Sequence, residues 1–278
     1  SKKRSFYGVI MAGGSLGAIF GSEISKRFSG SFDELGLELF SLSAALFLFL
    51  AMLLALYMLS ISNNDQTIDT DNAGGGSFDA IKNSLQINEI RNIASYVWIW
   101  TALMTVQWIT AINIVEDWSQ NSEQRLRFFA IMEQVISPLT LIIQLFFTNL
   151  IIKKIGIKNI LLSYGILFCI AFILYGLIPS IISVGVVTVF LRVFEYGINK
   201  PTRETIFSTL KKNDRYKSTV FIDTFISRFG DLSGSGFIAI GKLTSIAANS
   251  LPLIAIPIAG FLSILGIRIS RNINTKDL

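Results

Sequence analysis

The chain has 278 residues, of which 51% are hydrophobic and only 15% are charged, and its mean hydropathy is +0.58. A typical soluble domain is about 25% charged, so this composition excludes an ordinary soluble domain and indicates a membrane protein. The chain contains no His and a single Cys, which excludes a histidine proton switch and a disulfide within the chain.

Apolar stretches long enough to cross a bilayer recur along the whole chain. A spanning helix needs about 20 mostly apolar residues. We predict eight spanning helices within residues 6–22, 39–62, 92–115, 133–152, 159–191 (two helices), 220–240 and 243–267. Residues 159–191 carry no charge and are too long for one span, and Pro179 with Ser180 divides them. The predicted fold class is therefore all-α, a polytopic transmembrane helix bundle of about eight spans.

The first span contains Gly13, Gly17 and Gly21 at four-residue spacing. Residues four apart share one face of a helix, so these glycines predict a ridge for close packing against another helix. The stretch lacks the Lys-Ser/Thr pair that a phosphate-binding loop requires. Close packing is therefore the better interpretation.

Residues 63–91 interrupt the apolar pattern. They are polar and acidic and include a triple glycine, which is typical of a flexible linker, and we expect a short amphipathic helix at 78–90. The linker divides the chain into the end of an N-terminal helix half (1–62) and a six-helix C-terminal half (92–278).

The basic residues are distributed unequally between the two sides of the predicted bundle. If the linker is cytoplasmic, 17 Lys and Arg lie in cytoplasmic segments and five lie outside. This bias sets the orientation by the positive-inside rule and accounts for the net charge of +5 without nucleic acid. The last four basic residues between 200 and 217 are most simply explained as contacts with anionic lipid: Lys211, Lys212, Arg215 and Lys217.

Six helices after a long cytoplasmic linker match the major facilitator architecture. In that architecture two six-helix halves bind substrate between them at mid-membrane. The first two spans would then be the fifth and sixth helices, and we expect four more helices to precede them. The alternative is an eight-span protein of another design.

Acidic residues end the third span in the stretch INIVEDW, residues 112–118. Glu116 lies one helical turn from Asn113, whereas Asp117 points elsewhere. Glu116 is a candidate for ion coupling or substrate contact. The alternative, which its position favours, is an exposed carboxylate at the outer membrane boundary.

The sixth span ends in LRVFEYGINKPTRETIFSTL, residues 191–210. Its polar residues recur at three and four, so we expect one helix face to carry Arg192, Glu195, Tyr196 and Asn199. Pro201 should end or kink the helix at Lys200, and Thr202 should then cap a second, amphipathic helix at the inner membrane surface. Lys200 and Arg203 lie where the helix breaks, which suits the mouth of a cavity.

The seventh span carries three charges in the stretch FIDTFISRFGDLSG, residues 221–234. Its apolar residues contribute roughly −5 kcal/mol to insertion and its charges roughly +8 kcal/mol, so the charges must face protein or water. Asp223, Ser227 and Asp231 are four apart and line one face, and Arg228 can pair with Asp231. A translocation path and a charge network that fixes helix packing are equally consistent with this pattern.

Three stretches together resemble the ATP:ADP antiporter family, the nucleotide translocases of plastids and intracellular bacteria, which are similar in build to major facilitators. They are INIVEDW at 112–118, YGINKPTRE at 196–204 and YKSTVFIDTFISRFGDLSGS at 216–235. The resemblance covers residues 92–269 best, and GGSLGAIFGS at 13–22 fits the earlier half loosely.

The resemblance implies exchange of nucleotides, often ATP for ADP plus phosphate. It implies site roles for Glu116, Lys200, Arg203, Glu204, Asp223 and Arg228. The chain departs from the plastid and parasite translocases after the arginine. They have a motif like LGKSGG with a functional lysine, whereas this chain has Asp231 at the lysine position and resembles a wider bacterial branch.

These observations predict a secondary transporter, multi-pass in the bacterial inner membrane, that exchanges nucleotides or related anions by alternating access. The candidate substrate-binding residues are Arg192, Glu195, Asn199, Lys200, Arg203, Glu204, Asp223, Arg228, Asp231 and Glu116. Arg192, Lys200 and Arg203 would attract phosphate. The expected partners are the anionic substrate and membrane lipid, without nucleic acid. The sequence contains no metal-ligand cluster, catalytic triad or hydrolase motif, so we expect neither a cofactor nor an enzyme.

Two alternatives stay open at this point. One is a proton-coupled carrier of another solute, in which Asp231 and Glu116 would be the titrating groups. The other is a membrane scaffold or sensor that has lost transport, with the basic segment 200–217 and the acidic linker docking partners.

Overall fold

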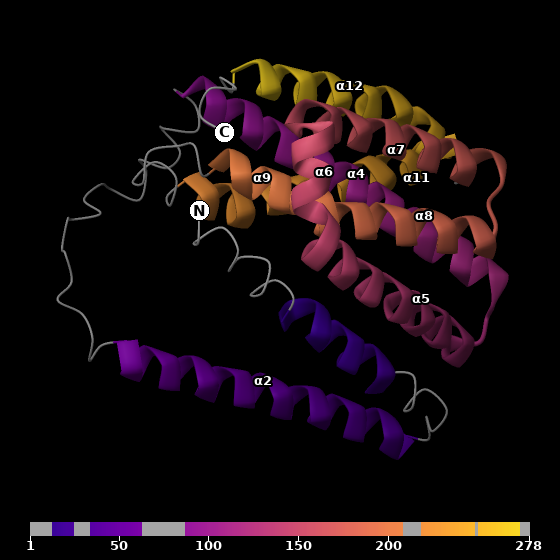
Figure 1. The fold of residues 1–278 in the computed structure, drawn as a ribbon. Helices are drawn as coiled ribbons and strands as arrows, with labels where there is room; N and C mark the ends of the chain where they lie inside the picture. The colour runs from indigo at the N-terminus through magenta and orange to yellow at the C-terminus, as the bar shows by residue number, and fades with distance from the viewer. Residues whose placement is uncertain (1–12, 25–33, 63–86, 208–217, 248–249, 273–278) are drawn as a thin grey trace.

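The computed structural model describes residues 13–24, 34–62, 87–207, 218–247 and 250–272, and its regular secondary structure in these ranges is entirely helical (Figure 1). Six helical segments are long and apolar enough to cross a membrane. They are Ser41–Met58, Ile90–Trp118, Ser122–Ile155, Ile157–Leu177, Ile181–Phe207 and Ser250–Ser270. The chain is therefore a multi-pass membrane protein with an all-α bundle, as the sequence predicted.

The helices follow the predicted order along the chain. The elements are α2 (Glu34–Ser62), α4 (Asn88–Trp118), α5 (Ser122–Ile142), η1 (Ile143–Phe147), α6 (Thr148–Ile155), α7 (Ile157–Leu177), α8 (Ile181–Phe194), η2 (Glu195–Asn199), α9 (Lys200–Phe207), η3 (Ile222–Ile226), α11 (Ser227–Leu243) and α12 (Ser250–Asn272), where η denotes a π-helical segment. The helix is unbroken through α5, η1 and α6, through α8, η2 and α9, and from η3 into α11.

Two predicted spans are not among the six apolar segments. Residues 6–12 of the first lie outside the described residues, and residues 13–24 are helical. The seventh is helical over 218–243, as predicted, but its three charges lower its apolar character. The eighth span was predicted to begin at Leu243, and this boundary is wrong. α11 ends at Leu243, and α12 begins at Ser250.

The predicted linker contributes little to the described structure. Residues 63–86, which include most of the expected amphipathic helix, lie outside the described residues. The last part of the predicted linker belongs to α4, which begins at Asn88.

Local signals in the sequence fix several helix ends. Ser180 accepts a hydrogen bond from the backbone N–H of Ser183, and the Ser183 hydroxyl accepts one from the Ser180 backbone N–H, so the two form a capping box that starts α8. Pro179 precedes this cap, and the division of 159–191 into two helices is confirmed. Gly156 separates α6 from α7 with φ of 81°, a conformation that glycine adopts without strain.

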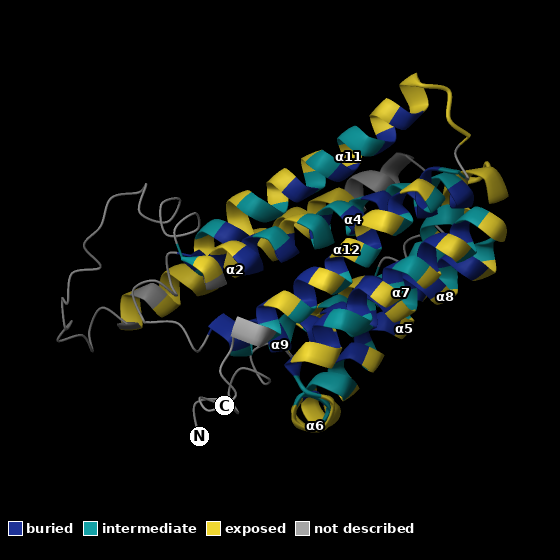
Figure 2. Ribbon diagram, turned by 90° about the horizontal axis from the view of Figure 1, so that it is seen from above, coloured by how far each residue is buried: buried dark blue, intermediate teal, exposed yellow. Residues whose placement is uncertain are grey.

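The tightest helix pairs are built on glycines. α12 packs along α7 and α4, while α11 packs along α4 (Figures 1 and 2). A Cβ added to Gly165 would overlap the Ser263 side chain and the Ala259 carbonyl of α12, and one added to Gly234 would overlap the Ala102 carbonyl of α4. These pairs therefore approach backbone to backbone, as small residues allow in membranes.

The glycine ridge of the first span has no helix packed against it among the described residues, so its role in close packing stays a prediction. Side chains added to Gly13, Gly17 and Gly21 would meet no atom of the described residues within 4 Å. The helix at 13–24 instead contacts the α5–η1 helix through polar groups: Ser15 donates to Gln144 Oε1 at 3.2 Å and Gln134 donates to Glu23 at 2.5 Å. Close packing in the described structure occurs in the C-terminal half.

The apolar helix α2 buries none of its spanning residues. Every described side chain in Ser41–Met58 is exposed or half-buried, and none is buried against the rest of the bundle (Figure 1). A helix that is apolar all round suits a lipid environment.

Pro201 does not end the helix, so the predicted end at Lys200 and the predicted cap at Thr202 are wrong. Because proline has no N–H, it leaves the carbonyl four residues earlier, that of Gly197, without its helical donor. Thr148 Oγ1 donates to the Gly197 carbonyl at 2.6 Å, and Gln144 Nε2 donates to the Tyr196 carbonyl at 3.0 Å. Donors on the neighbouring η1–α6 helix therefore let the helix continue through the proline.

This contact predicts the effect of Thr148→Val. The substitution keeps the shape of the side chain but removes the donor to the Gly197 carbonyl, so we expect the free energy of unfolding to fall by about 0.6 to 1.7 kcal/mol. Reversible unfolding in mixed micelles measures the change. The matched control is Thr244→Val, because Thr244 is exposed and bonds only to carbonyls of its own helix. Equal stability of the two variants would contradict the role given to Thr148.

Candidate functional site

A row of polar side chains lies buried along the sixth span. Glu195, Asn199 and Arg203 follow one another at four-residue intervals on η2 and α9, and their exposed fractions are 2%, 0% and 3%. α9 continues α8 through η2, and Figure 1 shows it at the end of that helix. Ionisable side chains inside a membrane protein are costly, and they mark substrate or ion pathways by default.

Glu195 lies at one end of this row, and hydrogen bonds from two side chains fix its surroundings. Asn199 Nδ2 donates to Glu195 Oε2 at 2.7 Å, and the Tyr96 hydroxyl of α4 donates to Asn199 Oδ1 at 3.3 Å. Because the Asn199 oxygen is occupied by Tyr96, its amide nitrogen is directed at the carboxylate. The spacing of η2 thus places a buried acid beside an oriented donor.

Arg203 forms the other end of the row and is only partly satisfied. Its Nη2 donates to Asp223 Oδ1 of η3 at 3.3 Å, and its guanidinium lies 5.0 Å from the centre of the Trp100 ring. Among the described residues, its buried Nε and Nη1 have no hydrogen-bond partner. A buried unpaired donor is destabilising, so this guanidinium retains donors for further acceptor oxygens.

Aromatic side chains form the wall beside this row. Trp100 Nε1 donates to the Tyr164 hydroxyl of α7 at 2.9 Å, and the Tyr164 ring stacks on Phe194 of α8. The indole ring next to Arg203 is therefore held in place by a second helix. The sequence reasoning missed Tyr96, Trp100 and Tyr164; the four-residue spacing of Tyr96 and Trp100 on α4 was the available signal.

We refer to Glu195, Asn199, Arg203, Asp223, Tyr96 and Trp100 as the Arg203 cluster. It joins α4, the η2–α9 helix and η3, three segments that are distant in the sequence. Two of the three π-helical segments, η2 and η3, supply three of its members. π-Helical bulges occur frequently at functional sites, where they re-aim side chains.

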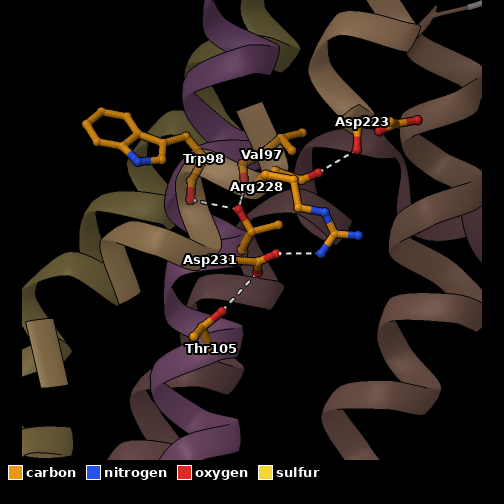
Figure 3. A network of polar contacts seen from close by, with 8 residues as sticks. Val97, Trp98, Thr105, Asp223, Arg228 and Asp231 are labelled. Carbon is orange, nitrogen blue, oxygen red and sulfur yellow. Dashed lines mark hydrogen bonds and ion pairs between the residues drawn. The ribbon is translucent and has the colours of Figure 1, made fainter. Parts of the chain in front are cut away.

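Arg228 and Asp231 form a second group on the α4–α11 pair, shown in Figure 3. Arg228 Nη1 lies 3.0 Å from Asp231 Oδ2, and Thr105 of α4 donates to Asp231 Oδ1 at 3.0 Å. The local ion pair that the spacing predicted is confirmed. Asp223 lies on the same helix but pairs with Arg203, so the predicted row of acids is divided between two groups.

We expect Arg228→Gln to change stability only slightly. The Arg228 side chain is 82% exposed and its partner is three residues away on the same helix. An exposed pair of this kind contributes about 0 to 1 kcal/mol, so the free energy of unfolding should fall by less than about 1 kcal/mol. A larger loss, measured by unfolding in mixed micelles, would show that Arg228 supports the bundle.

Arg192 is directed to α5 and away from the Arg203 cluster. Its Nη1 lies 2.6 Å from Glu133 Oε2, and its guanidinium is 5.8 Å from the centre of the Tyr196 ring. The sequence placed Arg192 on one face with Glu195, but their contacts lie on different neighbouring helices. The partner, Glu133, was not among the predicted site residues.

The remaining predicted site residues lie outside the row or at its edge. Glu116 is 54% exposed and sits 3.8 Å from Arg125, about 24 Å along α4 from Trp100. Lys200 and Glu204 are half-buried on α9, next in sequence to Asn199 and Arg203. The substrate roles of all these residues stay predictions.

Comparison with protein-family models and with curated proteins gives no match for this chain. The function is therefore argued from the geometry of the Arg203 cluster and from the membrane-spanning fold.

Proposed function

We propose that the chain is a secondary membrane transporter that binds a nucleotide or a related anion at the Arg203 cluster and exchanges it by alternating access. The observation that carries this proposal is the state of Arg203. The Arg203 side chain belongs to a residue that is 3% exposed, and its Nε and Nη1 have no hydrogen-bond partner in the part of the chain that the structure describes. Guanidinium groups bind phosphate and carboxylate oxygens through such donors.

The surroundings of Arg203 support reversible binding of an anion. Asp223 engages only Nη2, at 3.3 Å, and its side chain is more than one third exposed. Because this hydrogen bond is long and Asp223 is accessible to water, a substrate oxygen can displace Asp223 from Arg203. Arg192 and Arg228, by contrast, are matched at 2.6 and 3.0 Å by acids of their own.

The arrangement of the halves supports transport over a purely structural role. We propose that residues 92–278 form the C-terminal half of a facilitator-like carrier and that residues 1–62 belong to the other half, in a bacterial inner membrane. Polar contacts of Ser15 and Glu23 with the α5–η1 helix join the helix at 13–24 to the later part of the chain. The resemblance to ATP:ADP antiporters makes ATP and ADP the first anions to test.

Counterflow in proteoliposomes tests the proposal. The vesicles are loaded with unlabelled ADP, labelled ATP is added outside, and uptake is followed with and without internal ADP. We expect uptake that requires the internal nucleotide. If inserted, folded protein takes up neither ATP, ADP nor inorganic phosphate, nucleotide and phosphate exchange is wrong, and a scaffold or a carrier of another solute takes its place.

A further inference from the structure

Two opposite charges lie buried in the Arg203 cluster without pairing directly. Glu195 and Arg203 act on each other electrostatically, yet among the described residues no basic nitrogen lies within 4.0 Å of the Glu195 carboxylate. The carboxylate accepts a hydrogen bond from the neutral amide of Asn199 instead. The unpartnered donors of Arg203 therefore belong to a site that has a carboxylate at its edge.

An anion bound by Arg203 would meet the negative charge of Glu195. Repulsion between two negative charges inside the bundle is screened less than in water, so it weakens binding of the anion. The bound anion and an ionised Glu195 thus oppose each other. Binding is favoured when one of the two negative charges is neutralised.

We propose that the Arg203 cluster binds its anion together with one proton, which Glu195 carries. The proposal rests on the proposed function and adds the coupled ion to it. The proton comes from water on the side from which the anion enters, it binds a carboxylate oxygen of Glu195, and it leaves when the anion leaves. No covalent bond to the anion forms or breaks.

The groups around Glu195 leave it as the proton acceptor. The charged groups that act on Glu195 are the cations Lys200 and Arg203, and its other titratable neighbours are the hydroxyls of Tyr96 and Tyr164. Asp223, the other carboxylate of the cluster, has a side chain that is 39% exposed, so water screens its charge, whereas Glu195 is buried. Asp231 and Glu116, the titrating groups expected for a proton-coupled carrier, lie outside the cluster. The geometry therefore favours Glu195 as the group that carries the proton.

Asn199 suits both protonation states of Glu195. Its Nδ2 donates to a carboxylate oxygen at 2.7 Å, and the same donor serves the carbonyl oxygen of a neutral carboxylic acid. The Tyr96 hydroxyl keeps the amide in this orientation at 3.3 Å. The cluster therefore holds Glu195 in position whether or not the proton is bound.

Calorimetry of ATP binding in two buffers of different ionisation enthalpy tests the proposal on the purified protein. At about pH 8 the phosphates of ATP are ionised, so proton uptake belongs to the protein. We expect close to one proton taken up per ATP bound by the unaltered protein and none by Glu195→Gln. Asp231→Asn is the matched control and should retain the proton, because its carboxylate lies outside the cluster.

The outcomes separate this proposal from the proposed function. No binding of ATP or inorganic phosphate overturns both. Binding without proton uptake overturns the proton on Glu195 and leaves anion binding intact, and so does equal uptake by Glu195→Gln. Glu195→Asp, which keeps a carboxylate, should retain proton uptake, and its loss there together with retained binding would also contradict the proposal.

Discussion

Replacing Arg203 by Gln is expected to lower kcat/KM for anion exchange by about 10- to 150-fold. The substitution keeps a polar side chain but removes the positive charge and the charge-assisted hydrogen bonds, each of which contributes about 1.5 to 3 kcal/mol. Arg203→Lys should retain part of the activity because it keeps the charge without the planar array of donors. Initial rates of labelled ATP uptake into ADP-loaded proteoliposomes measure the effect.

The matched control for this series is Arg228→Gln. Arg228 is also a membrane-embedded arginine with an acidic partner, but its side chain is 82% exposed and it lies outside the Arg203 cluster. We expect its exchange rate to stay within about threefold of the unaltered protein, a difference of about 0.7 kcal/mol. Equal losses of exchange rate in Arg203→Gln and Arg228→Gln would contradict the assignment of the anion site to the Arg203 cluster.

The largest effect on folding is expected for Gly165→Leu. A side chain at this position meets the Ala259 carbonyl and the Ser263 backbone nitrogen of α12 at 2.6 and 2.7 Å, so backbone must move to admit it. The α7–α12 pair is the most extensive helix contact in the bundle, and Ser263 Oγ donates to the Leu162 carbonyl at 2.9 Å across it. We expect the free energy of unfolding to fall by about 3 kcal/mol or more.

Gly260→Leu provides the comparison on the same helix pair. A side chain added to Gly260 of α12 meets nothing within 4 Å, so the same change of residue should leave folding close to normal. Size-exclusion profiles and unfolding in mixed micelles distinguish the two. A stable, monodisperse Gly165→Leu protein would show that α7 and α12 do not need the backbone contact.

Much of the helix arrangement could be predicted from the sequence because hydrophobic length and turn signals are local. The uncharged run at 159–191, divided at Pro179 and Ser180, predicted two helices, and the capping box confirms their boundary. Pro201 shows where local reasoning fails. Carbonyls of the preceding turn are satisfied by Thr148 and Gln144 from another helix, and the spacing along one segment carries no information about such donors.

The site was predictable only in part for the same reason. Four-residue spacing placed Glu195 and Asn199 together, and the π-helical turn adds Arg203 to their row. The contact of Arg203 with Asp223 joins residues 20 positions apart, and its contact with Trp100 joins two separate spans. The glycine ridge at 13–21 has a regular spacing but no partner among the described residues, because spacing along one helix does not say which helix packs against it.

The central claim is that the partly satisfied Arg203 binds the transported anion. Equilibrium binding of labelled ATP to the purified protein and to Arg203→Gln tests it most directly, with folding of both checked by their unfolding transitions. We predict saturable binding that unlabelled ADP displaces and that Arg203→Gln weakens at least about tenfold, or by 1.4 kcal/mol. Equal affinities in the two folded proteins would contradict the claim and would place the anion elsewhere in the bundle.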